Sequence, residues 1–483
     1  MTLAHEIADR IHRLRYEDLT PIALDWTRAA FIDTVGVTLA GIVEDGPRFL
    51  MKVPGIATAP GPSLIFASDR RTSALDAALV NGTASHALDY DDVSGTLGGH
   101  PSVTLIPAML ALGEQLGSTG RDLALAYVVG FETECRIARG VHFHHYDKGW
   151  HPTATLGIFG TVAAAARLLR FTPDQTAMAL GLAASLASGL KANFGTMTKP
   201  LHVGHTARNG LFAALMVQQG FTANPAALEA RQGFLDVFNG PGTYDTDRIL
   251  ADWYAPLEVA GGGEPGLKPY PCCGSTHASI NRMIHLSRDY DLTPDRVAKI
   301  EIMPHARRLP HTNNPDPRTP LGAKFSIQYA VARALANRAV RLEHFEGEAH
   351  FDPVIRDLMA RTEARQHPDM PDASPLQWGA EVVVTTRDGQ RLASRLDDFE
   401  RRGPGGAPMG TEELWEKFQD CAKRALPRSN IAPLFDQLGN IEALGKVGDL
   451  TLLLERRAHE QPAASAVRPA DMLETTTATG WVP

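Results

Sequence analysis

The sequence predicts a mainly α-helical protein made of one large helical domain and a smaller α+β domain. Segments in its first half are apolar around most of their circumference, which is typical of helices inside a large bundle. Strand-like alternation of apolar and polar residues begins only after residue 260. The length of 483 residues also favours two domains over one.

The large domain is predicted to span residues 1–265. Its first helix places Leu3, Ile7, Ile11 and Leu14 at helical spacing. A helix that follows Thr172 has an N-cap residue and then proline, the expected start. The interior helices are predicted at 24–42, 122–140, 157–170, 172–190 and 204–220.

The smaller α+β domain is predicted at 266–402, after a Gly/Pro-rich hinge at 261–271. Residues 297–305 alternate like a strand, and Asp388-Gly389 divides 380–396 into a hairpin. Helices are predicted at 325–340, 353–365, 411–426 and 440–457. The segment 403–457 is expected to return to the large domain, and 458–483, which lacks periodicity, to form a flexible tail.

The composition excludes several classes of protein. A net charge of −8 argues against nucleic acid or an anionic membrane as the main partner. No apolar run reaches the roughly 18 residues of a membrane span, and no signal peptide is evident. Four cysteines without a C-x-x-C pair predict neither a disulfide framework nor an iron–sulfur cluster. Reduced thiols, and therefore a cytoplasmic location, are expected.

Basic side chains recur beside predicted helix starts. His100 and His151 each precede a proline, His277 lies in a first turn, and Lys199 and His202 stand just before an apolar helix. Free N–H groups make such ends positive, so together they would form a carboxylate site if they converge. Each histidine alone could equally cap or pack its own helix.

An acidic run follows His86 and contains Asp89, Asp91 and Asp92. His86 and Asp89 are three residues apart, so we expect them to share a helix face, with the carboxylate orienting an imidazole for proton transfer. The acids could instead bind a divalent metal, but their spacing is weak for that, and no metal is predicted.

Other motifs are weaker. Cys272 and Cys273 are interpreted as packing or turn residues rather than nucleophiles. The tract from His142 to His145 is interpreted as a solvated or interfacial loop rather than a metal site, because neighbouring positions do not face together. Neither a phosphate loop nor a nucleophile elbow is present.

Taken together, these motifs resemble the MmgE/PrpD family, which includes 2-methylcitrate dehydratase, cis-aconitate decarboxylase and iminodisuccinate epimerase. The resemblance implies an α+β lid over the helical domain, a homodimer, and cofactor-free chemistry on small di- or tricarboxylates in the cleft between the domains. The matching segments run in order between about residues 78 and 335: ALVNGTASHALDYDDVSGTLGGHPS, GWHPTATLG, NFGTMTKPLHVGHTARNG, GLKPYPCCGSTHASIN and AKFSIQYAVARAL.

The resemblance implies catalytic roles for Asp89, His100, Lys199 and His277. Lys199 and His151 would hold carboxylates, His100 or His277 would take the α-proton, and Asp89 would orient an imidazole or act as base. In the same motifs, His202, His86 and Ser102 are predicted to contact substrate.

Loss of water, loss of CO2 and epimerisation share an enolate-like species, so one pocket could serve all three. Family membership favours a dehydratase or decarboxylase, with an epimerase as the alternative. A non-catalytic carboxylate-binding homologue and a metal-dependent hydrolase are the interpretations from other classes.

Overall fold

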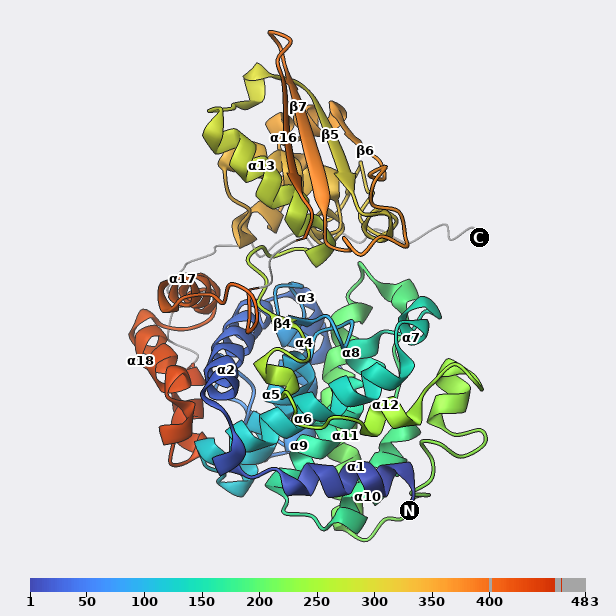
Figure 1. Cartoon of the computed structure of the whole chain (residues 1–483). Coiled ribbons are helices and arrows are strands. Elements are labelled where there is room, and N and C mark those ends of the chain that lie inside the picture. Colours follow the sequence, from blue (N-terminus) through green and yellow to red (C-terminus); the bar gives the residue numbers. More distant parts are fainter. Residues whose placement is uncertain (399–401, 457–461, 463–483) are drawn as a thin grey trace.

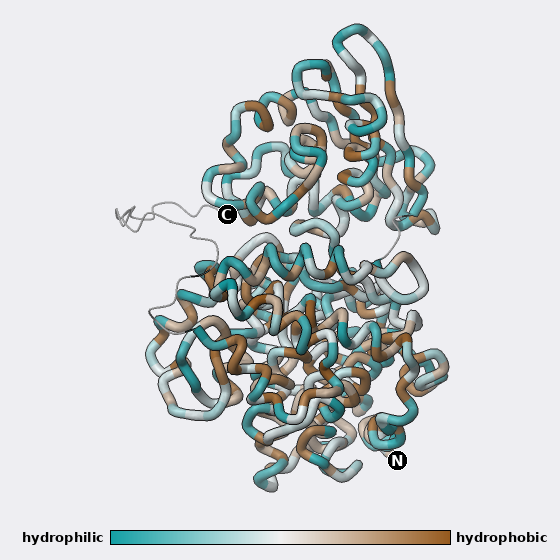
Figure 2. Tube along the Cα trace, turned by 90° about the vertical axis from the view of Figure 1, so that its left-hand side faces the viewer, coloured by the Kyte–Doolittle hydropathy of each residue, from teal (hydrophilic) through white to brown (hydrophobic). Residues whose placement is uncertain are grey.

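The computed structural model describes residues 1–398, 402–456 and 462, and it is mainly helical. Figure 1 shows a larger helical body with a smaller, sheet-containing body above it. One cluster of buried apolar side chains runs from Leu3 to Leu267 and includes residues 414–454. A separate cluster lies between Cys272 and Leu392. The trace viewed from the side shows the same two bodies, with apolar stretches inside the larger one (Figure 2).

The larger body is a bundle whose central helices α4, α5 and α9 are buried along most of their length. Burial on all sides explains why their sequences show no polar face. Its longer helices are α1 (Leu3–Arg13), α2 (Pro21–Gly41), α4 (Ala74–Ser85), α5 (Ser102–Leu116), α6 (Gly120–Val141), α9 (Gly157–Leu168), α10 (Pro173–Ala184), α11 (Thr198–Gln218), α17 (Thr411–Ala422), α18 (Arg428–Gly439) and α19 (Val447–Leu454).

Several predicted boundaries are wrong. The helix expected at 172–190 ends at Ala184. The helix expected at 204–220 begins earlier, at Thr198, and therefore contains Lys199 and His202. Pro200 is tolerated in its first turn because the N–H groups there have no partner within the helix. Helix α18, which contains Pro433, was not predicted. The larger body is also not wholly helical, since β1 (Ser63–Leu64) pairs with β2 (Arg71–Thr72), and β3 (Val93–Ser94) with β4 (Pro265–Gly266).

Helices α4 and α11 cross at two glycines. A Cβ atom on Gly204 would lie 2.2 Å from the carbonyl oxygen of Leu79 and 2.2 Å from Thr83 Oγ1. A Cβ atom on Gly82 would lie 2.9 Å from the Cα atom of Gly204. This crossing therefore requires glycine, and it fixes the end of α4 against the beginning of α11.

The smaller body contains a four-stranded sheet in the order β6-β5-β7-β8. Its strands are β5 (Val297–Pro304), β6 (Thr362–Ala364), β7 (Ala380–Thr386) and β8 (Arg391–Leu396), and its longer helices are α13 (His277–Asp289), α15 (Ile327–Asn337) and α16 (Pro353–Ala360). Helix α13 packs on β7 and β8, and α15 packs on α13.

The strand at 297–305 and the hairpin at Asp388-Gly389 are confirmed, with Val383 opposite Ala393 and Gly389 at φ +89. The expected helix 353–365 is wrong at its end, because Thr362–Ala364 instead pairs in parallel with β5. The domain division at 265/266 stays a prediction. The predicted tail 458–483 lies outside the described residues, apart from residue 462. Within the described ranges, every helix is too short or too polar to cross a membrane.

Glu134 on α6 provides a stability prediction. Both of its carboxyl oxygens are buried without a hydrogen-bond partner among the described residues. Burial, with Asp92 nearby, raises its pKa well above 4.5. At pH values above about 4.5 the folded state therefore keeps the Glu134 carboxyl proton, whereas the unfolded chain releases it. The free energy of unfolding consequently falls as the pH rises.

We expect Glu134→Leu to raise the free energy of unfolding by about 1–3 kcal/mol near pH 8, because it removes an unpaired buried polar group. Urea unfolding of both proteins at about pH 5 and 8 measures this. Glu132→Leu on the same helix is the control and should destabilise, since Glu132 accepts hydrogen bonds from Arg136 and two backbone N–H groups. A less stable Glu134→Leu protein at pH 8 would contradict the expectation.

Candidate active site

A cavity of about 1100 Å³ lies between the two bodies. The larger body contributes wall residues from the acidic run, the Gly-rich loop 93–99 and the beginning of α11, and the smaller body contributes the beginning of α13 and two loops. Five of the predicted site residues line this one cavity, although they are far apart in sequence: Asp89, His100, His151, Lys199 and His277.

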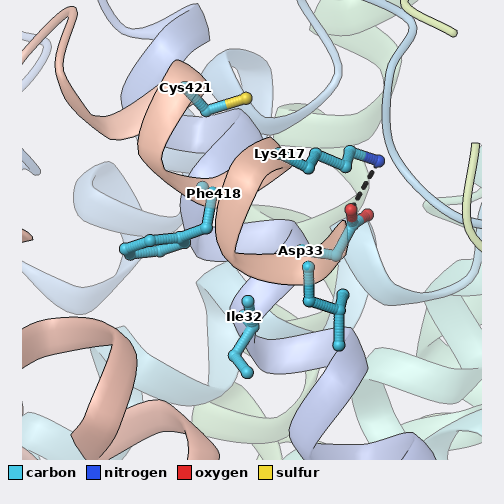
Figure 3. A pocket seen from close by; sticks show the side chains of 7 residues that line it. Ile32, Asp33, Lys417, Phe418 and Cys421 are labelled. Atoms are coloured by element: carbon cyan, nitrogen blue, oxygen red, sulfur yellow. Dashed lines mark ion pairs between the residues drawn. The ribbon is translucent and has the colours of Figure 1, made fainter. Parts of the chain in front are cut away.

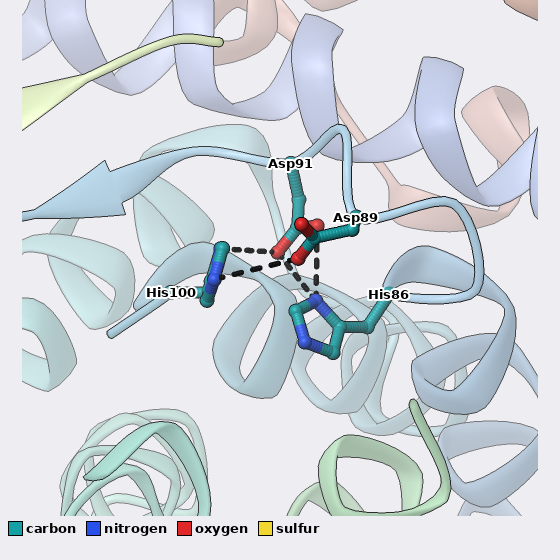
Figure 4. Close-up of side chains that lie close together, drawn as sticks. All are labelled: His86, Asp89, Asp91 and His100. Carbon is teal, nitrogen blue, oxygen red and sulfur yellow. Dashed lines mark hydrogen bonds and ion pairs between the residues drawn. The ribbon is translucent and has the colours of Figure 1, made fainter. Parts of the chain in front are cut away.

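The acidic run leaves the helix earlier than predicted. Helix α4 ends at Ser85, and Asp89 adopts a left-handed conformation with φ 52, so His86 and Asp89 do not share a helix face. Asp91 takes the predicted place of Asp89, because its carboxylate accepts a hydrogen bond of 2.8 Å from His86 Nδ1 (Figure 4). The predicted pairing was wrong because the chain reverses at Asp89, where helical spacing no longer applies.

Asp89 lies between two ammonium groups. Its Oδ1 is 2.5 Å from Lys199 Nζ, and its Oδ2 is 3.1 Å from Lys268 Nζ. Burial alone would raise the pKa of Asp89, but the two lysines outweigh it and hold the pKa well below its usual range. These three buried groups carry a net charge of +1 on the cavity wall. Lys268 was not predicted.

His100 presents one nitrogen to the acidic run and the other toward Asp89. Its Nδ1 is 2.8 Å from the backbone oxygen of Asp92 and 3.0 Å from Asp91 Oδ2. Both neighbours are acceptors, so Nδ1 carries the proton and Nε2 is the basic nitrogen, 3.8 Å from Asp89 Oδ1. Burial outweighs Asp91 and lowers the pKa of His100 below 6.5, which makes it a neutral imidazole at pH 7.

His277 is the first residue of α13, as the sequence predicts, and it reaches the cavity from the smaller body. Its Nε2 donates to the backbone oxygen of Cys272 at 3.2 Å, so Nδ1 is the basic nitrogen. Burial, with Lys268 nearby, lowers the pKa of His277 to about 3. His100 and His277 are thus neutral imidazoles on the cavity wall that come from different bodies.

His151 also lines the cavity, but His202 does not and lies beside it. The two Nδ1 atoms are 3.2 Å apart, so one of the rings must donate to the other. Burial, with Lys199 nearby, lowers the pKa of His151 well below 6.5. His202 therefore supports His151, and its direct contact with substrate stays a prediction.

His86 and Ser102 are likewise buried and do not line the cavity, and their contacts with substrate stay predictions. The His86 ring packs edge-on against His100, with 4.6 Å between ring centres. Ser102 donates a hydrogen bond of 2.6 Å to Asp92, whose backbone oxygen accepts from His100. Both residues therefore contact His100 or its hydrogen-bond partner.

Lys417 of α17 ties the return segment to the site. Its Nζ is 2.5 Å from Asp33 on α2 (Figure 3). The same ammonium donates to the backbone oxygens of Tyr90 and Lys268, at 2.8 and 2.9 Å. It therefore joins the segment that carries Asp89 to the one that carries Lys268.

Of the two alternatives predicted for His142–His145, a solvated or an interfacial loop, the structure agrees with the interfacial one. His145 is fully buried and bonds to Asn239 and Thr155, and His142 lines the cavity. Aromatic packing around His145 holds this tract against the larger body. The aromatic-rich segment FHHYDKGW is a sequence signal for this packing, but the spacing of its histidines alone does not indicate that His145 is buried.

The two adjacent cysteines face different surroundings. Cys272 is buried in the core of the smaller body, and Cys273 lines the cavity. Burial raises the pKa of both thiols, that of Cys272 to about 12. Neither is therefore a thiolate at neutral pH, which agrees with their interpretation as non-nucleophilic residues.

Four side chains place possible metal-ligand atoms within 4.8 Å of one another: His86, Asp89, Asp91 and His100 (Figure 4). These atoms already have partners. Asp91 accepts from both imidazole Nδ1 atoms, and Asp89 is neutralised by Lys199 and Lys268. Two ammonium groups this close would repel a divalent cation, so the donor set fits a hydrogen-bonded imidazole–carboxylate system better than a metal site.

Comparison with known proteins agrees with this arrangement. A human cis-aconitate decarboxylase is 28% identical over 481 residues, covering 96% of this chain and 97% of the relative. A mouse cis-aconitate decarboxylase is 27% identical, covering 94% and 93%, and one from Aspergillus terreus is 24% identical, covering 93% and 95%. Residues 5–247 match the MmgE/PrpD N-terminal domain and residues 270–434 match the MmgE/PrpD C-terminal domain. The chain therefore belongs to the MmgE/PrpD family of enzymes.

Proposed function

We propose that this protein is a cofactor-free lyase that acts α to a carboxylate of a small di- or tricarboxylic acid. The observation that carries the proposal is the neutral His100 imidazole, whose basic Nε2 faces a wall containing Lys199 and Lys268. Eight Lys or Arg and five Asp or Glu side chains line the cavity, whereas the whole chain has a net charge of −8. A local excess of cations suits an anionic substrate.

The groups can be assigned complementary roles. Lys199 and Lys268 would bind the carboxylate next to the reacting carbon and stabilise the enolate-like charge. In a dehydration, His100 takes the α-proton while an ammonium group protonates the departing hydroxyl. In a decarboxylation, the bond to the leaving CO2 breaks, its electron pair stays on the carbon, and an ammonium group supplies the proton. Asp89 keeps both ammonium groups in place.

Relatives named cis-aconitate decarboxylase make cis-aconitate the first substrate to test, with 2-methylcitrate second. The alternative is an epimerase acting on a dicarboxylate such as iminodisuccinate. That alternative is favoured by the two neutral imidazoles, His100 and His277, which reach the cavity from different bodies. A base on each side of a substrate is what inversion of a carbon centre requires.

We further propose that the smaller body acts as the lid of the site, because it brings His277 to the cavity wall. The domain boundaries given by the sequence, at 265/266 and 402/403, fit this role. The homodimer and the cytoplasmic location stay predictions. Sedimentation of the purified chain measures the first, and imaging of a tagged chain in its own cell the second.

The test is an NMR assay in D2O with cis-aconitate, 2-methylcitrate, citrate and iminodisuccinate. Loss of CO2 or water supports the lyase, whereas deuterium exchange at the α-carbon without net conversion supports the epimerase. Activity that disappears with a chelator and returns with a metal would contradict the cofactor-free mechanism. If no substrate reacts or exchanges, while binding persists, the non-catalytic interpretation replaces the lyase.

For a reaction in which His100 removes a proton, the acidic limb of the pH profile is expected below 6.5. Burial lowers the pKa of His100 and lowers that of His277 to about 3, and a base loses activity only when it is protonated. A lowered pKa therefore extends activity to lower pH. The measurement is kcat/KM from about pH 4.5 to 8, corrected with the pH dependence of inhibition by an unreactive tricarboxylate. A limb at or above 6.5 would contradict the assignment.

A further inference from the structure

Two half-buried cations on the cavity wall have no carboxylate within ion-pair distance among the described residues: Lys191 and Arg308. Lys191 Nζ lies 3.4 Å from the centre of the Tyr146 ring and donates to the Tyr146 backbone oxygen at 2.9 Å. Arg308 lies 3.6 Å over the Trp378 ring, and its Nε donates to the Gln377 backbone oxygen at 2.8 Å. Both charges are thus held in place by aromatic rings and carbonyl groups rather than by an ion pair, with Asp147 acting on Lys191 from beyond ion-pair distance.

Most other cations on the wall already have anionic partners. Arg139 Nε donates to Glu258 at 2.6 Å, Arg402 pairs with Glu413, and Lys199 and Lys268 share Asp89. Arg307 is exposed and lies 3.9 Å from Asp372, and Arg248 is exposed to water. Lys191 and Arg308 therefore differ from the rest in being sheltered and unpaired.

The two cations come from different bodies but share a neighbour. His311 also lines the cavity, and its Nε2 is 2.9 Å from Ser275 Oγ. Burial, with Arg308 and Lys191 nearby, lowers the pKa of His311 to about 4, so this ring adds no charge. Lys191 of the larger body and Arg308 of the smaller body are thus both neighbours of the neutral His311 ring.

This pair shares the wall of one cavity with the inner lysines, and Cys273 lines the same wall. Burial also lowers the pKa of Arg308 to about 10, which indicates that its positive charge is poorly solvated. A sheltered, unpaired cation gains more from a bound anion than an exposed one does.

We propose that Lys191 and Arg308 form a second anion subsite that binds the far carboxylate of a tricarboxylic acid, while Lys199 and Lys268 bind the carboxylate next to the reacting carbon. The inference rests on the proposed function for the inner carboxylate. It makes the outer pair the determinant that selects tricarboxylates over dicarboxylates. Because one cation belongs to each body, the bound anion also joins the bodies across the cavity.

The test compares Arg308→Gln and Lys191→Met with Arg307→Gln, a matched control for loss of a cation on the same loop. The probes are two unreactive acids, propane-1,2,3-tricarboxylate and methylsuccinate, which lacks one terminal carboxylate, measured by calorimetry at constant ionic strength. We expect both variants to bind the tricarboxylate about 10- to 100-fold more weakly and methylsuccinate nearly as well as before, whereas Arg307→Gln changes either by less than about 3-fold.

Equal tricarboxylate affinity in Arg308→Gln and Arg307→Gln would overturn the subsite, as would an equal loss for the two probes. Turnover of the wild-type enzyme is measured separately. If the wild type reacts with none of the candidate substrates but its tricarboxylate binding depends on Arg308, the subsite stands and the lyase proposal fails. If the wild type turns over cis-aconitate and Arg308→Gln keeps its kcat/KM, the subsite fails and the lyase proposal stands.

Discussion

For a dehydration or an epimerisation, in which His100 is the base, His100→Gln is expected to lower kcat by about 10²- to 10⁴-fold while KM changes little. Glutamine can keep a hydrogen bond to the acidic run, but it has no basic nitrogen to place where His100 Nε2 faces Asp89 and the cavity. Folding should persist, since the charge at neutral pH is unchanged. Steady-state kinetics with the substrate identified by NMR, together with a melting curve, measure both properties.

The control is His12→Gln on α1, where His12 bonds to Thr176 and does not line the cavity. It should leave kcat unchanged. His277→Gln completes the comparison. In a lyase that uses His100 alone as base, His277→Gln should lower kcat less than His100→Gln does. In an epimerase that uses both histidines, the two changes should lower kcat equally. If His100→Gln retains more than about a tenth of kcat, His100 is not the base.

Lys268→Met is expected to lower kcat/KM by about 10²- to 10³-fold. Lys268 donates to the Asp89 backbone oxygen at 2.8 Å and lies 3.1 Å from its carboxylate, so its removal leaves Asp89 paired with Lys199 alone. The pKa of the buried Asp89 carboxyl then rises, and the enolate-like species loses one of its two ammonium groups. Kinetics and the affinity for propane-1,2,3-tricarboxylate measure the loss.

Lys324→Met is the matched control, because Lys324 is also buried and donates to a nearby backbone oxygen, that of Pro271, but does not line the cavity. This change should affect stability more than it affects anion binding. If Lys268→Met weakens binding no more than Lys324→Met does, Lys268 has only a structural role. Circular dichroism of both variants separates misfolding from the loss of a charge.

Much of the site could be predicted because its residues lie in short motifs whose local structure is set by neighbouring residues. Proline after His100 and His151 fixes where the next helix begins, and His277 opens α13. Local signals of this kind identify the side chains that reach the cavity wall. They also identified the Asp388-Gly389 hairpin, where the turn residues and the alternation of the strands agree.

The remaining features depend on contacts between distant segments. Lys268 lies in a Gly/Pro-rich hinge without periodicity, and its partner Asp89 is 179 residues away. Asp91 replaced Asp89 as the partner of His86 because of one left-handed residue. Ser102 looks accessible within its motif, yet it points at Asp92 inside the bundle. Spacing along the chain carries no information about such contacts.

The crossing at Gly82 and Gly204 limits how this enzyme can diverge. A methyl group at 204 would meet the backbone oxygen of Leu79, which no side-chain replacement can remove. The helices would have to move apart. Because Lys199 is on α11, this movement would change the 2.5 Å distance between Asp89 and Lys199. Descendants of this sequence can therefore vary at the subsite proposed for Lys191 and Arg308, while the α4–α11 crossing has to be inherited intact.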